Sequence, residues 1–295
     1  MKIRFSYLFL LFLCANANAE VLDLTIALQN TYRNCAGIDD DLHELKVLAG
    51  VNTAVTAVGT GAGVGAVATG FAKERTDAEI AKMERYFNKL DAAAAKQQTI
   101  PTRVDATPQQ IHSLFADSGA NETKSEIEKL TQKSKKLGNW RTGLLATNTA
   151  TNIAGAIIAN KSKVNKDLQQ QIDDCVSSIH KLNDAILSAK MNGEDIGEAQ
   201  TIYNACRDYE YVDIKPINKR GTGAMVATSI GAVAGGIGTI TSGVANSDKI
   251  RDDNTDAGKQ KEKNLNTASN VLAIGATAAS ATATVFNAMG EVQQN

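Results

Sequence analysis

Four segments without a single charged side chain constrain this sequence more than any other feature. They span residues 47–72, 142–160, 221–246 and 264–290, and charged segments separate them. All four are rich in Ala, Gly, Thr and Ser, with scattered Val, Ile and Leu. Each is long enough, or nearly so, to cross the roughly 30 Å hydrocarbon layer of a bilayer as a helix. We therefore predict four small-residue helices.

Small residues recur at every fourth position within these segments. On a helix this spacing makes a nearly straight ridge, which lets a second helix approach closely. Because glycine costs about 1 kcal/mol against alanine in a helix, we expect tight packing to offset the cost, and Gly235→Ala to be tolerated or stabilising. The glycines predicted as helix-packing contacts are Gly61, Gly65, Gly155, Gly231 and Gly235.

The charged segments carry apolar residues at alternating steps of three and four. This heptad-like pattern predicts amphipathic helices over 80–94, 127–137, 168–186 and 196–206, with an irregular connection at 98–122. Only three prolines occur, and neither strand alternation nor hairpin signals stand out. The predicted fold is all-α: an antiparallel bundle of four Gly/Ala/Thr-rich helices, with amphipathic coiled-coil-like helices extending from it.

A short motif occurs twice and indicates a duplication. Gln29-x-x-Tyr32-x-x-Cys35 returns as Gln200-x-x-Tyr203-x-x-Cys206, and each copy precedes an acidic stretch and a small-residue segment. We predict a first half over 20–205 and a second over 206–295, each with two small-residue helices.

The first nineteen residues have the three parts of a secretory signal. Lys2 and Arg4 precede an apolar run, and Ala17-Asn18-Ala19 is a small-x-small cleavage site. We expect cleavage near Ala19 and an extracytoplasmic protein, in the periplasm, at the cell surface or secreted, where disulfides can form.

Three cysteines follow the leader: Cys35, Cys175 and Cys206. Cys175 and Cys206 occupy seam positions of helices that face each other across a turn at Gly193, so this pair is the preferred disulfide. Cys175 precedes the turn by 18 residues and Cys206 follows it by 13, a mismatch of about 7.5 Å on ideal helices. Pairing of Cys35 with either of the others is the alternative.

No motif predicts catalysis, a cofactor or a metal site. Gly61-x-Gly63-x-x-Ala66 matches a dinucleotide pattern, but it lies inside a helical segment with no strand before it. His43, His112 and His180 are far apart, without metal-ligand spacing. After the leader, 29 basic residues face 32 acidic ones, which gives no footprint for nucleic acid. We predict that the protein is not an enzyme.

Two functions remain. The first is a non-enzymatic extracytoplasmic structural or interaction protein, with a protein partner or self-association. The alternative is a secreted membrane-inserting or pore-forming protein that uses the small-residue helices as hairpins. Asn and Thr interrupt these segments, and Leu and Phe, which drive insertion, are sparse, so the sequence favours the first.

Overall fold

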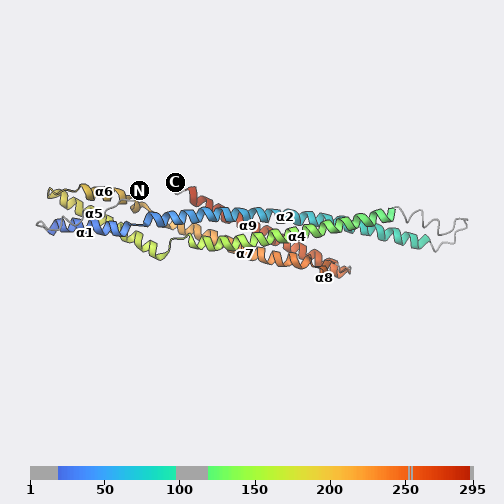
Figure 1. Ribbon diagram of the computed structural model, residues 1–295. Coiled ribbons are helices and arrows are strands. Elements are labelled where there is room, and N and C mark those ends of the chain that lie inside the picture. The colour runs from blue at the N-terminus through green and yellow to red at the C-terminus, as the bar shows by residue number, and fades with distance from the viewer. Residues whose placement is uncertain (1–18, 98–118, 252, 254, 293–295) are drawn as a thin grey trace. The chain divides into compact units, whose positions relative to one another are not determined.

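The computed structural model describes residues 19–97, 119–251, 253 and 255–292, and every regular element among them is a helix (Figure 1). The prediction of an all-α chain is therefore confirmed for these residues. Residues 1–18 of the predicted leader (1–19) and residues 98–118 of the predicted connection (98–122) lie outside the described residues. The helices are α1 (Ala19–Cys35), α2 (Ile38–Gln97), α4 (Gly119–Lys161), α5 (Lys166–Met191), α6 (Gly197–Cys206), η1 (Arg207–Tyr211), α7 (Ile214–Ala245), α8 (Asp248–Arg251) and α9 (Asp256–Val292).

Internal contacts divide the chain into two units that alternate along the sequence. Unit 1 comprises Met1–Leu48 and Ser162–Lys219, and unit 2 comprises Ala49–Lys161 and Arg220–Asn295. The sequence had indicated two consecutive halves that meet at residues 205 and 206. The difference arises because residues near both ends of that first half pack together in unit 1.

The charged segments continue the small-residue helices without a break. α2 runs for 60 residues through the predicted separate helix at 80–94, and α4 unites 127–137 with 142–160. Neither helix contains a proline, and an i,i+4 ion pair between Lys73 and Asp77 bridges the change of composition in α2. α4 begins at Gly119, so residues 119–122 of the predicted connection are helical.

Unit 1 has an ordinary hydrophobic core. α1 packs along α5, and α6 contacts both (Figure 1). The Asn165 side chain caps α5 by accepting the Leu168 N–H at 2.7 Å, and Gly193, with φ +76°, makes the turn that leads to α6. The buried apolar side chains of this unit include Ile38, Leu168, Ile172, Ile179, Leu182 and Ile186.

The disulfide of unit 1 joins Cys35 to Cys175, with their Cα atoms 4.8 Å apart, while Cys206 is a half-buried free thiol. The preferred pair, Cys175–Cys206, is therefore not formed, and one of the alternatives is. Cys206, the last residue of α6, packs against the apolar cluster that contains Cys35 and Cys175 but is not bonded to either. α1 instead follows α5 and brings Cys35, its last residue, to Cys175.

Candidate functional site

Most buried residues of unit 2 follow a heptad pattern, and almost all are small or polar. In all four long helices these seam positions recur at alternating steps of four and three, the period of a coiled-coil seam, while Ala62, Thr76, Ala227 and Asn270 are buried outside this pattern. Leu145 alone among these seam positions is a large apolar residue. The positions are Asn52, Thr56, Gly59, Gly63, Ala66, Gly70 and Lys73 in α2; Ser134, Gly138, Arg141, Leu145, Asn148, Asn152, Gly155 and Ala159 in α4; Gly221, Ala224, Thr228, Gly231, Gly235, Gly238, Ser242 and Ala245 in α7; and Asn266, Ser269, Ala273, Ala276, Ser280, Ala283 and Asn287 in α9.

Hydrogen bonds between helices hold this interior together. The Asn152 amide of α4 donates to the Ser280 hydroxyl of α9 at 2.9 Å and to the Asn148 Oδ1 at 2.7 Å. The Asn52 amide of α2 donates to the Asn287 Oδ1 at 3.1 Å. These side chains are buried, so each bond pairs groups that would be costly to leave unpaired, although the Asn52 Oδ1, Asn148 Nδ2 and Asn287 Nδ2 have no partner among the described residues.

The same interior links α7 to its neighbours. The hydroxyls of Thr142 in α4 and Ser242 in α7 are 2.8 Å apart, and the Ser269 hydroxyl of α9 donates to the Gly238 carbonyl of α7 at 3.0 Å. Polar contacts of this kind between closely spaced backbones are typical of helix packing inside a membrane.

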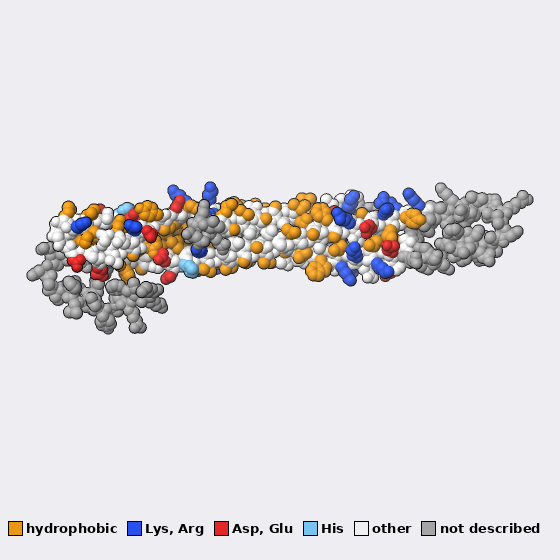
Figure 2. Space-filling view, turned by 90° about the horizontal axis from the view of Figure 1, so that it is seen from above, with side chains coloured by type: hydrophobic (Ala, Val, Ile, Leu, Met, Phe, Trp, Pro, Cys, Tyr) orange, Lys and Arg blue, Asp and Glu red, His pale blue; other side chains and the backbone are white. Residues whose placement is uncertain are grey.

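The outer surface of the same segments is uncharged and carries many apolar side chains. We call the exposed Val, Ile, Phe and Met side chains of residues 49–72, 142–160, 221–246 and 264–290 the apolar belt. Figure 2 shows orange and white atoms along the middle of unit 2, with Lys and Arg side chains gathered where this stretch ends on the right. The belt comprises Val51, Val58, Val64, Phe71, Ile153, Ile157, Val226, Ile230, Val233, Ile237, Ile240, Val244, Val271, Ile274, Val285 and Met289.

The length of the apolar belt matches a bilayer. Its shortest segment lies between Arg141 and Lys161 and holds 19 residues, which is about 28 Å of helix. The hydrocarbon core of a bilayer is about 30 Å thick. The other three charge-free segments are longer, so every long helix of unit 2 can cover this thickness.

A buried ionic cluster closes one end of the polar interior. The Lys73 ammonium, 2% exposed, lies 2.8 Å from Asp77 and 3.0 Å from Glu262, and the Ser134 hydroxyl donates to Asp77 at 2.5 Å. The fully buried Arg141 donates to the backbone carbonyl of Asn266 at 3.1 Å. Asn270 also donates to Glu74. The Lys73 charge is thus compensated by two carboxylates inside the protein, as a buried charge requires, whereas the Arg141 Nε has no hydrogen-bond partner among the described residues.

The predicted packing glycines occupy different environments. A Cβ atom built on Gly231 would lie 2.8 Å from the Asn152 side chain, and one on Gly235 would lie 2.7 Å from the Thr149 Oγ1. Gly155 faces Thr228, Thr56 and Asn52, and Gly65 faces Leu144.

Gly61, by contrast, faces open space and makes no such contact. A ridge of residues four positions apart drifts by about 40° around the helix at each step, whereas positions seven apart stay on nearly the same face. Gly59, Gly63, Gly70 and Gly138 also make close contacts, and the four-residue spacing did not predict them. The signal that could have found them is a seven-residue spacing, such as Gly59, Ala66 and Lys73 in α2.

We expect Gly235→Leu to destabilise unit 2 by about 1–3 kcal/mol, because its side chain would collide with Thr149. Gly235→Ala is now also expected to destabilise, since even the Cβ meets the Thr149 Oγ1. Gly243→Leu is the matched control on the same helix, because its Cβ position is open. Thermal unfolding in detergent measures the difference, and equal melting of Gly235→Leu and Gly243→Leu would contradict the close contact.

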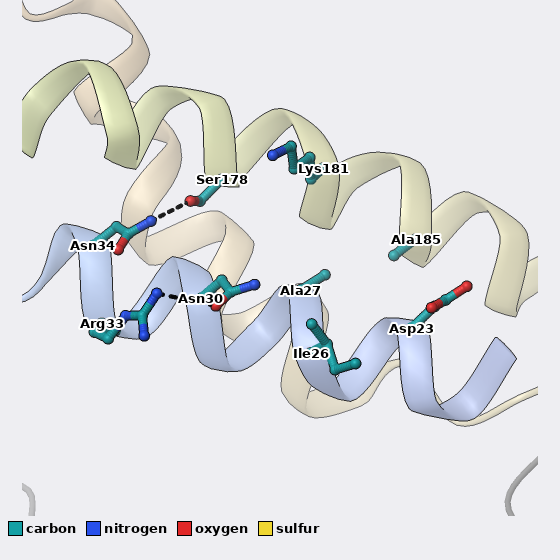
Figure 3. A pocket seen from close by; sticks show the side chains of 9 residues that line it. All are labelled: Asp23, Ile26, Ala27, Asn30, Arg33, Asn34, Ser178, Lys181 and Ala185. Carbon is teal, nitrogen blue, oxygen red and sulfur yellow. Dashed lines mark hydrogen bonds between the residues drawn. The ribbon is translucent and has the colours of Figure 1, made fainter. Parts of the chain in front are cut away.

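Unit 1 has a shallow groove on its surface. It has a volume of about 430 Å³ and lies between α1 and α5 (Figure 3). Asp23, Arg33 and Lys181 line it, and the Asn34 amide donates to the Ser178 hydroxyl across it at 2.8 Å. That hydroxyl also donates to the Asp174 carbonyl at 2.8 Å, so it is engaged in structure. The groove is open and half polar, and its lining contains no pairing of a nucleophile with a base.

The comparisons with known proteins return nothing: no family model, no curated protein and no solved structure matches the chain. By length and composition, three helices of the described residues are apolar enough to cross a membrane. They lie within Asp23–Tyr86, Ile214–Ala245 and Asp256–Met289.

Proposed function

We propose that this is a membrane-inserting protein without enzymatic activity, in which the four long helices of unit 2 cross the bilayer as an antiparallel bundle. One observation carries the proposal: unit 2 buries Asn, Ser, Thr and Gly and exposes Val and Ile. A water-soluble bundle has the opposite distribution, since burial of apolar surface drives its folding. In lipid the inverted distribution is favourable, because apolar side chains face the acyl chains and polar groups, most of which have hydrogen-bond partners here, are kept inside.

The order of the contacts supports the antiparallel arrangement. Gly59 of α2 lies against Thr151 of α4, and Gly70, further along α2, lies against Arg141, which comes earlier in α4. Gly231 and Gly235 of α7 face Asn152 and Thr149 of α4 in the same reversed order. Neighbouring helices that run in opposite directions suit hairpins across a membrane.

α4 is less apolar than the three helices that reach the hydropathy of a membrane span, and its position explains why it can still cross. Its polar residues Asn148 and Asn152 point into the interior, where Ser280 donates to the Asn148 Oδ1 and accepts from the Asn152 amide. The residues that remain outside are Ile153, Ile157 and several small or weakly polar residues. Mean hydropathy underestimates how apolar the outer face of such a helix is, because the mean includes inward-pointing side chains that do not contact lipid.

The packed interior argues against a pore through a single copy. Cβ atoms added at Gly63, Gly155 or Gly231 would lie within about 3 Å of a side chain from another helix. Little room for an aqueous channel remains. We therefore favour insertion without permeation over the pore-forming form of the hypothesis.

Two measurements test the proposal. Membranes from cells that express the full chain are washed with alkaline carbonate, and the purified protein is reconstituted with vesicles that contain a trapped dye and is then floated on a density gradient. We expect the protein to resist the wash and to float with vesicles that retain their dye. Release by carbonate together with no flotation would show a soluble structural or interaction protein instead, and dye release would restore the pore-forming alternative.

A further inference from the structure

We propose that the end of the apolar belt at Trp140 is an interfacial band that binds the headgroups of anionic lipids. The inference rests on the proposed function and names the lipid class that this end of unit 2 recognises. Trp140 is the single tryptophan of the chain and is 69% exposed. It lies two residues before the charge-free segment that starts at Thr142. Tryptophan is enriched at this depth because its ring is apolar and its N–H is polar.

Two lysines share the outer face of α4 with Trp140. Lys133 and Lys136 precede it by seven and four residues, so all three lie within about 60° of one another around the helix. Both lysines are exposed. Side chains of this length can lay their methylene groups along apolar surface and place the ammonium among headgroup phosphates.

A second helix reaches the same level with the same order of residues. Gly70 of α2 lies against Arg141 of α4, which places the exposed Phe71 near the level of Trp140 along the bundle. Arg75 follows Phe71 by one turn and is exposed. On both helices, an aromatic ring lies next to the apolar belt and a basic side chain lies further from it, as expected where hydrocarbon gives way to headgroups.

Four acidic side chains of this end are engaged within the protein, while Glu79, one turn beyond Arg75 on α2, is exposed. Asp77 and Glu262 hold the Lys73 ammonium, and Glu74 accepts a hydrogen bond from Asn270. Asp248 pairs with Arg251 at 2.7 Å and with Lys135 at 3.5 Å. The positive charge of Lys133, Lys136 and Arg75 is therefore not cancelled by these four carboxylates. Basic side chains at the end of an apolar belt attract a leaflet of anionic lipids.

The single tryptophan makes the inference directly measurable. The full chain is reconstituted into mixed vesicles of phosphatidylcholine and phosphatidylglycerol, in which one or the other lipid carries bromine on its acyl chains at equal mole fraction. Bromine quenches Trp140 only when the lipid lies beside it. We expect brominated phosphatidylglycerol to quench more strongly, with a relative affinity of about fivefold per contacting lysine.

Two double variants make the test specific. Lys133→Gln/Lys136→Gln is expected to abolish the preference for phosphatidylglycerol. Lys89→Gln/Lys124→Gln is expected to keep it, because Lys124 lies about 24 Å from Trp140 along α4 and Lys89 about 27 Å from Phe71 along α2. Equal quenching by both lipids in the natural chain would overturn the inference, as would an unchanged preference in Lys133→Gln/Lys136→Gln. If neither lipid quenches Trp140 but the protein still floats with vesicles, this inference fails and the proposed function stands. If the protein does not float, the proposed function fails as well.

Discussion

Val233→Lys/Ile237→Lys is expected to release the protein from membranes. Both residues belong to the apolar belt near the middle of α7, and they are 64% and 47% exposed. A lysine at the centre of a membrane-spanning helix costs about 2.5–3.5 kcal/mol, so two cost about 5–7 kcal/mol. We expect most of the variant to appear in the supernatant after carbonate extraction or to be degraded, while the natural chain stays in the pellet.

The same double substitution separates the two function hypotheses because they predict opposite results. In a water-soluble bundle both positions are solvent-exposed, and lysine there would change the free energy of unfolding by less than about 0.5 kcal/mol each. It would also make the surface more soluble. A variant that is as stable as the natural chain, and that divides between pellet and supernatant as the natural chain does, would contradict membrane insertion.

Ser125→Lys/Gln132→Lys is the matched control for added charge. Both residues are exposed on α4, outside the charge-free segment. Since these positions lie beyond the apolar belt, two lysines here are expected to leave carbonate resistance unchanged. Release of this control would show that net charge, and not the position of the charge, controls extraction.

The helical class could be predicted from the sequence because it depends on local features. The absence of charge over 26 residues in 221–246, and the heptad seam over 168–186, are visible without knowledge of any neighbour. The buried face of the small-residue helices was harder to predict. Gly, Ala, Ser and Thr occur all around these helices, so several spacings fit, and the step of four at Gly61 and Gly65 was one of them.

The distribution of side chains in unit 2, with polar residues inside and apolar residues outside, could not be predicted from average composition. Asn148 and Asn152 lower the mean hydropathy of their segment, and this had favoured a soluble bundle. Their position on the seam of α4, four residues apart and next to Ser280 of α9, shows that they point inward. Which helix supplies Ser280 depends on tertiary packing, so the sequence alone left the two hypotheses open.

The disulfide was misassigned because the sequence showed two helices joined by a short turn and gave no reason to place α1 beside α5. Of the three cysteines, Cys206 keeps its thiol. Burial, and then the charge of Asp39, raise the pKa of Cys206. A thiol with a raised pKa is a poor nucleophile, so exchange of Cys206 into the Cys35–Cys175 bond is disfavoured at neutral pH.

Cys35→Ser/Cys175→Ser is expected to lower the free energy of unfolding by about 2–5 kcal/mol. The bond closes a loop across a sequence separation of 140 residues, and removal of such a constraint increases the entropy of the unfolded chain. Thermal unfolding of the purified oxidised protein should therefore begin at a lower temperature in the variant, and the reduced natural chain should behave like it. Cys206→Ser, as the control, should stay within about 1 kcal/mol of the natural chain because its thiol is half-buried and unbonded. If Cys206→Ser produced the larger loss, or if peptides mapped without reduction joined Cys175 to Cys206, the bond between α1 and α5 would be refuted.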